Sequence, residues 1–388
     1  MEPTTPEDGK MTRREMLKRC LVAGAGLCLG GKLVTDWLGH RPAAEAAGLL
    51  PQGWHESDYY DKLSGSRVRC NICPRQCVVN DRERGHCGTK QNIGGRYYTL
   101  IYGQVAALNI DPIEKKPFFH FLPGTAALSL GTAGCNLHCR DCQNWEISQR
   151  RPEQVRSAHY SPELLVNLAR RRRCTSLAYT YNEPTIFFTF MRDTARLGRS
   201  RGLRSVMVSN GYMRREPLLE LTRVLDAIKI DLKSGTNDFY KKYCDAALAP
   251  VQATIKRVHS VGKWLEVVYL VVPGLNDSRD TIARACDWLL KAAGPETPLH
   301  FSRFYPEYKL KNLPATPFDT LARCYQQACQ AGLHYVYVGN VPQQQYQQTY
   351  CPQCRKVVIE RDGFRVTGLN LAGGKCRFCA RKIPGVWA

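Results

Sequence analysis

The chain has 388 residues, enough for a barrel-sized domain with smaller modules beside it, which excludes a miniprotein held together by disulfides alone. Most of its 18 cysteines are grouped, and a formal net charge of +21 predicts affinity for something acidic. Nucleic acid, an anionic membrane surface and an acidic protein all fit that charge, so charge alone does not choose among them.

The first 46 residues are typical of a removable export signal. Arg13 and Arg14 resemble the pair in twin-arginine signals, and the apolar run from Cys20 to Gly31 follows without an acidic residue. This run is too short to span a bilayer comfortably, and Ala44-Glu45-Ala46 has the small-x-small pattern at which a signal peptidase cuts. We expect export to the periplasm by the twin-arginine route. An uncleaved form, cytoplasmic or membrane-tethered, is the alternative.

Residues 47–125 are predicted to form a small cysteine-rich module and a lead-in to the next domain. The module has four cysteines at the spacing C-x2-C-x3-C-x9-C: Cys70, Cys73, Cys77 and Cys87. Four thiolates can hold zinc or an auxiliary iron–sulfur cluster. The unequal spacing favours zinc, and the cluster is the alternative.

Residues 126–345 alternate short β-rich runs with stretches whose apolar residues recur at helical spacing. The seven runs are residues 127–130, 177–180, 206–208, 227–230, 267–272, 300–304 and 335–338. This alternation predicts an α/β fold with parallel strands, as a full or partial TIM-type (β/α) barrel. In such a barrel the loops after the carboxyl ends of the strands converge on one rim.

The loop after the first of these strands carries three cysteines at the spacing C-x3-C-x2-C: Cys135, Cys139 and Cys142. A 4Fe-4S cluster normally takes one thiolate per iron, so three thiolates leave one iron open, whereas structural zinc would want a fourth protein ligand. The spacing resembles the cluster motif of the radical SAM superfamily. The resemblance implies that S-adenosylmethionine (SAM) binds the open iron and is cleaved reductively to a 5′-deoxyadenosyl radical.

Polar residues after the other strands would meet these cysteines at the rim. A zwitterionic ligand needs a carboxylate near its ammonium group, donors near its carboxylate and polar groups near its ribose. By similarity to radical SAM barrels, Glu183 would approach the SAM amino group. Asn210, Asp231 and Lys233 would contact the rest of the cofactor.

Asp141 departs from the aromatic residue that commonly precedes the third cysteine of this motif and packs beside the adenine. The adenine contact must then come from elsewhere, and the candidates follow directly: Gln143, Asn144 and Trp145. Trp145 equally suits a core anchor.

Residues 346–388 carry two C-x2-C pairs separated by 21 residues: Cys351, Cys354, Cys376 and Cys379. This pattern is typical of a zinc ribbon, in which four thiolates close a structural tetrahedron. Two disulfides formed after export are the alternative.

Several motifs in order resemble one family. They are the C-x2-C-P segment at Cys70, Asp111–Pro117, Gly134–Asn136, Cys142–Trp145, Tyr181–Pro184 and Ile383–Trp387. Over about residues 55–388 the chain resembles the AmmeMemoRadiSam system radical SAM enzymes, which are related to the pyruvate formate-lyase activating enzymes. The resemblance implies hydrogen abstraction from an unidentified substrate, and the kinship suggests a partner protein. Lys115, Lys116 and His120 are expected either to touch that partner or to lie in a solvated loop.

Two other functions stay open from the sequence. A basic zinc-ribbon protein would bind nucleic acid with a steep salt dependence. An exported iron–sulfur protein would only transfer electrons, without SAM turnover. The arginine run at 170–173 does not favour the first, because it lacks interleaved aromatic residues and ends a predicted helix. No motif identifies an electron donor.

Overall fold

The computed structural model describes residues 51–387, so the predicted export signal lies outside the described residues. The contacts divide the chain into Met1–Gln52 and Gly53–Ala388, and the second unit contains all the grouped cysteines. Within residues 51–387, no helix is both long enough and apolar enough to cross a membrane.

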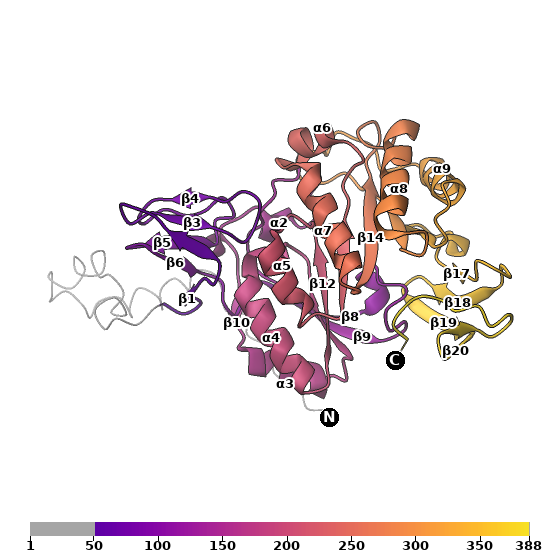
Figure 1. Ribbon diagram of the computed structural model, residues 1–388, viewed down its shortest axis with the longest axis horizontal. Helices are drawn as coiled ribbons and strands as arrows, with labels where there is room; N and C mark the ends of the chain where they lie inside the picture. Colours follow the sequence, from indigo (N-terminus) through magenta and orange to yellow (C-terminus); the bar gives the residue numbers. More distant parts are fainter. Residues whose placement is uncertain (1–50, 388) are drawn as a thin grey trace, which may run out of the picture. The chain divides into compact units, whose positions relative to one another are not determined.

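An eight-stranded sheet forms the centre of the second unit (Figure 1), in the order β16-β15-β14-β13-β12-β11-β9-β8. Its strands are β8 (Ala107–Pro112), β9 (Ala126–Gly131), β11 (Ser176–Tyr179), β12 (Arg204–Ser209), β13 (Ala227–Asp231), β14 (Trp264–Val271), β15 (Leu299–Arg303) and β16 (Val336–Gly339). Neighbours from β9 to β16 are parallel, and β8 pairs antiparallel with β9. All seven predicted runs contribute a strand. In the described chain β8 and β16 are the unpaired edges, so the hydrogen-bonded sheet is open.

Helices connect the parallel strands and lie along one face of the sheet (Figure 1). The longer ones are α3 (Pro162–Arg171), α4 (Phe188–Ser200), α5 (Arg215–Thr222), α7 (Leu248–Ser260), α8 (Arg279–Ala293) and α9 (Phe318–Gln330). Short turns of helix are α2 (Trp145–Ser148), α6 (Asn237–Phe239), η2 (Ile113–Lys115), η3 (Pro152–Gln154), η4 (Pro184–Phe187), η5 (Tyr240–Cys244) and η6 (Gln344–Tyr346). Two helices begin where a serine hydroxyl accepts a backbone amide: Ser161 from Leu164 in α3, and Ser278 from Thr281 in α8.

The two faces of the sheet carry different side chains, because successive residues of a strand point to opposite faces. On the helix face, large residues such as Leu128, Tyr179 and Ile230 pack in the main hydrophobic core. The other face, which we call the inner face, carries small residues such as Ala127 and Ala178 and packs against the loop that follows β8. The small inner residues let this loop pack closely against the sheet.

Two small β modules flank the sheet. The N-terminal module has the sheets β1-β6-β5 and β2-β3-β4, formed by β1 (His55–Glu56), β2 (Tyr60–Lys62), β3 (Val68–Cys70), β4 (Val78–Val79), β5 (Lys90–Ile93) and β6 (Arg96–Thr99). The C-terminal module has the sheets β17-β18-β19 and β20-β21, formed by β17 (Thr349–Tyr350), β18 (Val357–Asp362), β19 (Arg365–Leu369), β20 (Leu371–Ala372) and β21 (Lys375–Cys376). A further pair joins β7 (Gln104–Val105) to β10 (Ala158–His159). Because β8 joins the central sheet, part of the predicted lead-in is structurally continuous with the predicted barrel domain.

Candidate functional site

The carboxyl ends of the parallel strands border a cavity of about 550 Å³, which we call the rim cavity. Inner-face residues such as Lys229, His300 and Ser302 form part of its wall. Its volume lies within the range of small-molecule and cofactor sites, roughly 300–1,000 Å³. The structure brings the three predicted cluster cysteines and all five predicted cofactor contacts to this cavity: Cys135, Cys139, Cys142, Asn144, Glu183, Asn210, Asp231 and Lys233.

The three cluster cysteines, which we call the triad, are spread too widely for one metal ion. Sulfur ligands of a tetrahedral zinc lie about 3.8 Å apart. Within residues 51–387, the sulfur atoms of Cys135, Cys139 and Cys142 do not all come within 4.8 Å of one another. Burial raises the pKa of Cys142 to about 11, so metal must displace a proton when it binds there. The donor set fits a multi-iron cluster.

Cys244 lies against the triad, although it belongs to none of the cysteine groups in the sequence. Hydrogen bonding to the Cys244 thiol, together with burial, raises the pKa of Cys139 well above its ordinary value. The backbones meet as well: the amide of His138 donates to the Cys244 carbonyl (3.1 Å), and the amide of Arg140 donates to the Tyr243 carbonyl (2.9 Å). No local motif marks Cys244, because only the fold brings it to the triad.

Glu183 is held at the rim cavity by four hydrogen bonds. Its Oε1 accepts from the amide (2.9 Å) and hydroxyl (2.5 Å) of Thr185 and from the Ser209 hydroxyl (2.7 Å). Its Oε2 accepts from the Asn210 amide (2.7 Å). Burial raises the pKa of this carboxyl, and the four donors oppose the rise. With only one protein partner, Oε2 retains acceptor capacity for a ligand ammonium group.

The two asparagine candidates are tied to neighbouring loops. The Asn210 Nδ2 donates to Asn136 Oδ1 (2.9 Å) and lies 3.8 Å from the Cys135 sulfur. The Asn144 Nδ2 donates to the Tyr181 carbonyl (2.7 Å). Asn210 therefore supports the triad loop, while Asn144 links two of the loops that surround the cavity.

Asp231 lies between two lysines at the end of β13. Its Oδ1 pairs with the Lys229 ammonium, and its Oδ2 is 2.9 Å from the Lys233 Nζ. Burial raises the pKa of Asp231, but the two lysines outweigh burial and hold the pKa well below its usual range. Burial lowers the pKa of Lys233, but Asp231, Cys139 and Asp141 outweigh it and raise that pKa. Lys229 could not be predicted as a site residue, because a lysine inside a β-rich run carries no sign of facing a cavity.

Asp141 points into the same buried region, and Trp145 does not. Asp141 is 3% exposed, burial raises its pKa, and its Oδ1 has no hydrogen-bond partner among the described residues. Trp145 stacks on Tyr308 (centroids 5.4 Å apart) and donates to Glu307 (3.2 Å), and it does not line the cavity. The alternative that Trp145 anchors neighbouring structure therefore agrees better with its position.

The residues at the rim cavity fit SAM. SAM carries an ammonium, a sulfonium, a carboxylate and a ribose. The cavity offers acceptor capacity on Glu183 and Asp141, a lysine ammonium on Lys233, and the three thiols for a cluster. The unpaired Asp141 oxygen is notable, because a buried polar atom without a partner is costly unless a ligand satisfies it.

The loop after β8 is less solvated than the sequence suggested. Asp111 accepts from Lys115 (2.9 Å), Lys116 (2.6 Å) and the Tyr181 hydroxyl (2.7 Å). Lys116 is 3% exposed and lines the rim cavity, whereas half of the Lys115 side chain is exposed. His120 is fully buried, bonded to a β16 tyrosine and to a carbonyl near the C-terminus. The expectation of a solvated loop is therefore wrong for Lys116 and His120, whereas contact of Lys116 with a partner stays a prediction.

The four cysteines of the N-terminal module lie in one neighbourhood but not in a zinc tetrahedron. Burial raises the pKa of Cys73 to about 12, and Cys70, Cys87 and Cys77 act in the same direction. In the chain from 51 to 387, however, no three of these four sulfur atoms all come within 4.8 Å of one another. The predicted preference for zinc finds no support in this arrangement, because zinc would need spacings of about 3.8 Å.

The four cysteines of the C-terminal module do form a compact metal-like set. All four sulfur atoms lie within 4.8 Å of one another, with Cys351 and Cys379 3.5 Å apart and Cys354 and Cys376 3.7 Å apart. A disulfide would need about 2.05 Å, and all four are free thiols. The set can bind one tetrahedral metal ion.

Arg361 fastens this C-terminal module to the loop after β8. Its guanidinium is buried, donates to the Phe119 carbonyl (2.6 Å) and the Thr349 hydroxyl (2.9 Å), and lies 4.1 Å from the centre of the Phe119 ring. Phe364, in the turn between β18 and β19, lines the rim cavity although its side chain is 44% exposed. The module therefore contributes to the wall of the candidate site.

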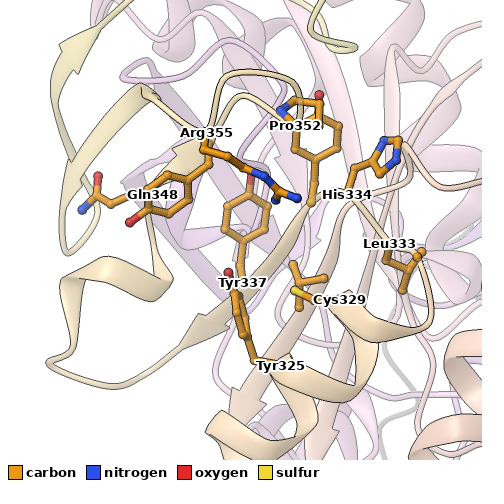
Figure 2. Close-up of a pocket in the computed structure, with 12 residues that line it drawn as sticks. Tyr325, Cys329, Leu333, His334, Tyr337, Gln348, Pro352 and Arg355 are labelled. Atoms are coloured by element: carbon orange, nitrogen blue, oxygen red, sulfur yellow. The ribbon is translucent and has the colours of Figure 1, made fainter.

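A separate cavity of about 580 Å³ lies at the amino-terminal end of β16 (Figure 2). Tyr325 and Cys329 of α9 face Arg355 of the C-terminal module across it. None of the predicted site residues lines this cavity. It is therefore distinct from the rim cavity, whose β16 wall is at the carboxyl end of the strand.

Known proteins resemble this chain in the region that carries the candidate site. A sequence model of the radical SAM superfamily matches residues 129–286, which include the triad and the cofactor candidates. The chain is 45% identical over 330 residues to the uncharacterized protein MJ0808 of Methanocaldococcus jannaschii, across 84% of this chain and 98% of that protein. It is 26% identical over 256 residues to the uncharacterized protein MJ0674 of the same organism, across 63% and 68% of the two chains.

Solved structures resemble parts of the chain more distantly. A domain of pyruvate-formate lyase-activating enzyme from Bacteroides vulgatus matches with a TM-score of 0.39 and 17% identity, over 42% of this chain and 99% of that one. A radical SAM methyltransferase from Sphaerobacter thermophilus matches with a TM-score of 0.45 and 12% identity, over 79% and 84%. Such scores identify neither substrate nor partner. The chain therefore carries a radical SAM domain over residues 129–286, and it belongs to one family with MJ0808.

Proposed function

We propose that this protein is a radical SAM enzyme of the AmmeMemoRadiSam type, which cleaves SAM reductively and abstracts hydrogen from a partner protein. One observation carries the proposal: the triad and five polar residues from the ends of four neighbouring strands, β9, β11, β12 and β13, line a single cavity of about 550 Å³. The parallel strands that carry these residues support a partial (β/α) barrel.

The chain's own residues have distinct parts in this reaction. The triad thiols would hold a 4Fe-4S cluster, and when bound the reduced cluster would supply the electron that breaks a carbon–sulfur bond of SAM. Glu183 would orient the SAM amino group through Oε2, since its other oxygen is already occupied by Thr185 and Ser209. Lys233, fully charged beside Asp231, would stabilise an anionic group of the ligand.

The test is anaerobic reconstitution of the full chain with iron and sulfide, followed by addition of dithionite and SAM. We expect 5′-deoxyadenosine and methionine, measured by liquid chromatography with mass spectrometry. Cys139→Ala should abolish both products, while the matched control Cys329→Ala, which removes an exposed thiol of α9, should retain them. Product formation by Cys139→Ala would refute the assignment. Transfer of deuterium from a labelled protein pool into 5′-deoxyadenosine would identify a protein substrate.

Two further parts of the proposal concern metal and location. Zinc in the C-terminal module is supported by the compact four-cysteine set, and metal analysis should find one zinc that Cys354→Ser removes.

Export by the twin-arginine route is supported by Arg13 and Arg14. Cell fractionation should find the chain in the periplasm without its first 46 residues, and Lys at both arginine positions should retain it in the cytoplasm. Full-length chain with Met1 intact in the cytosol would contradict export.

A further inference from the structure

The N-terminal cysteine module and the triad border one further cavity, of about 640 Å³. Cys87 of the module and Cys135 of the triad both line it, so Cys135 lies between this cavity and the rim cavity. We call it the basic cavity because of the arginines at its edge. The basic cavity therefore brings a cysteine of the N-terminal module and a cysteine of the triad, distant in the sequence, to one wall.

The loops that carry these thiols are in direct contact. Gly134 has a φ of +87°, and a Cβ there would lie 2.8 Å from the Cys87 carbonyl oxygen. Only glycine permits this approach, since a side chain would clash. From the other side, Arg75, between two module cysteines, donates to the carbonyl of Asn136 (2.6 Å), the residue after Cys135. The module and the triad are therefore joined on both flanks of Cys135.

Two histidines make a further contact between the module and the triad. His86 precedes Cys87, His138 precedes Cys139, and the two imidazole rings stack with their centroids 4.2 Å apart. Both rings approach Asp245, at 3.5 Å and 3.8 Å. The stacked rings and their shared carboxylate neighbour hold the two cysteine loops close together. Electron transfer between two metal centres requires such proximity.

The spread of the module thiols indicates the kind of centre. The C-terminal cysteines, at 3.5 Å and 3.7 Å, have the spacing of a single tetrahedral ion. The triad and the N-terminal module share the opposite property, since in residues 51–387 neither set has three sulfur atoms all within 4.8 Å of one another. Four thiolates spread more widely than an ion allows match the four-cysteine ligation of an iron–sulfur cluster.

The outer edge of the basic cavity carries a net positive charge. Arg82, Arg84, Arg150 and Arg151 line it, against a single lining carboxylate, Glu83, and Arg84 is also paired with Glu153 (2.9 Å). Three of the four arginines are exposed. Such a patch attracts a negatively charged protein and raises its rate of association.

We infer that Cys70, Cys73, Cys77 and Cys87 hold a second iron–sulfur cluster, which passes electrons one at a time from an acidic one-electron carrier protein to the triad. The inference rests on the proposed function of the triad. In each transfer the reduced carrier is oxidised by one electron, the module gains and then loses that electron, and the triad centre is reduced. No bond or proton changes place in the module. The contact between Cys87 and Gly134 provides the short path.

Iron content tests the second cluster independently of SAM cleavage. The full chain, reconstituted without air, should bind about eight irons, as two 4Fe-4S clusters. The triad variant Cys135→Ala/Cys139→Ala/Cys142→Ala and the module variant Cys73→Ala/Cys87→Ala should each retain about four. The two half-loaded variants should also differ in their electron paramagnetic resonance spectra, with only the module variant responding to SAM. A triad variant that binds zinc and no iron in the module would overturn the inference, even if the full chain cleaves SAM.

Electron transfer is tested by comparing two reductants on the same preparation. The readout is the rate of SAM cleavage driven by a reduced acidic ferredoxin, divided by the rate driven by dithionite. We expect the module variant to lower this ratio by about tenfold or more. An unchanged ratio in a module variant that has lost its iron would overturn the relay.

Charge reversal tests the entry point without removing a cysteine. Arg82→Glu/Arg151→Glu should retain about eight irons and lower the ferredoxin-to-dithionite ratio by about tenfold at low salt, with a smaller effect at high salt. The matched control Arg170→Glu/Arg171→Glu, at the end of α3, changes the same net charge and should leave the ratio unchanged. Equal effects of the two double variants would overturn docking at the basic cavity.

Discussion

Replacing Asp231 with asparagine tests the electrostatics of the rim cavity. The carboxylate of Asp231 is the shared partner of two lysines on the same strand and loop, Lys229 and Lys233. Asparagine has nearly the same shape, so the change removes charge and leaves packing in place. Removing one member of a buried ion pair costs about 3–5 kcal/mol, because the remaining charge loses its compensation.

The structure places the expected cost near the lower end of that range. The side chains of Lys229, Asp231 and Lys233 are 5%, 25% and 16% exposed, so water partly screens the carboxylate. We therefore expect the free energy of unfolding to fall by about 3 kcal/mol at pH 7. The lost stability should partly return as the pH rises into the alkaline range, because burial lowers the pKa of Lys229 and an uncharged Lys229 relieves the repulsion.

The stability of the Asp231→Asn variant at acid pH gives a second test. In the native protein the pKa of Asp231 lies well below its usual range, so its stabilisation is fully present above the unfolded-state pKa of about 3.9. That stabilisation is lost as the pH falls through the lower folded-state pKa. Asp231→Asn should lack this part of the acid-induced loss.

Denaturant unfolding at several pH values measures both effects. The matched control is Asp280→Asn, whose carboxylate pairs with Arg284 at the surface, with 71% of the Asp280 side chain exposed. The control should change the unfolding free energy by about 0.5 kcal/mol or less. A loss below about 1 kcal/mol for Asp231→Asn, or a loss equal to that of the control, would refute the argument.

Three other changes test the contacts around the site. Gly134→Ala should lower the free energy of unfolding by about 1–3 kcal/mol and reduce iron loading of the triad, because the φ of Gly134 is +87° and the new methyl group meets Cys87. An unchanged melting temperature and iron content would contradict this. Cys376→Ser should remove one metal ion per chain and make residues 346–388 sensitive to protease. Retention of the metal would exclude the proposed metal site in the C-terminal module. Arg361→Met should lower the free energy of unfolding by about 3 kcal/mol and speed hydrogen exchange in β17 and β18, since three acceptors, on Gln347, Thr349 and Phe119, lose a charged donor. Native protection there would show that Arg361 does not fasten the module.

Much of the central fold could be predicted from local pattern. Parallel strands buried on both faces produce short β-rich runs, and each of the seven predicted runs contains a strand. The eighth strand, β8, escaped because it precedes the repeating βα pattern and pairs antiparallel. An open sheet and a closed barrel share the same alternation in sequence, so pairing of the edge strands is visible only in the fold.

The candidate site divides in the same way. Spacing identified the triad, and turn residues after strands identified Glu183 and Asp231, because the carboxyl ends of parallel strands share one rim. Lys229, buried on the inner face, and Cys244, brought back against Cys139, have no local signature. His120 was expected in a solvated loop, but the C-terminal segment covers this part of the loop and buries the side chain.

The sequence by itself determined which chemistry the chain can carry, since a thiol's ability to bind iron and its spacing along a loop are local properties. It determined the α/β alternation and the paired C-x2-C pattern of the C-terminal module for the same reason. Only the tertiary structure decided which groups act together: it joined Cys87 to Gly134, spread the module thiols beyond the reach of one ion and enclosed Asp231 between two lysines. These are relations between residues far apart in the chain, and they exist only after burial and close packing bring them into contact.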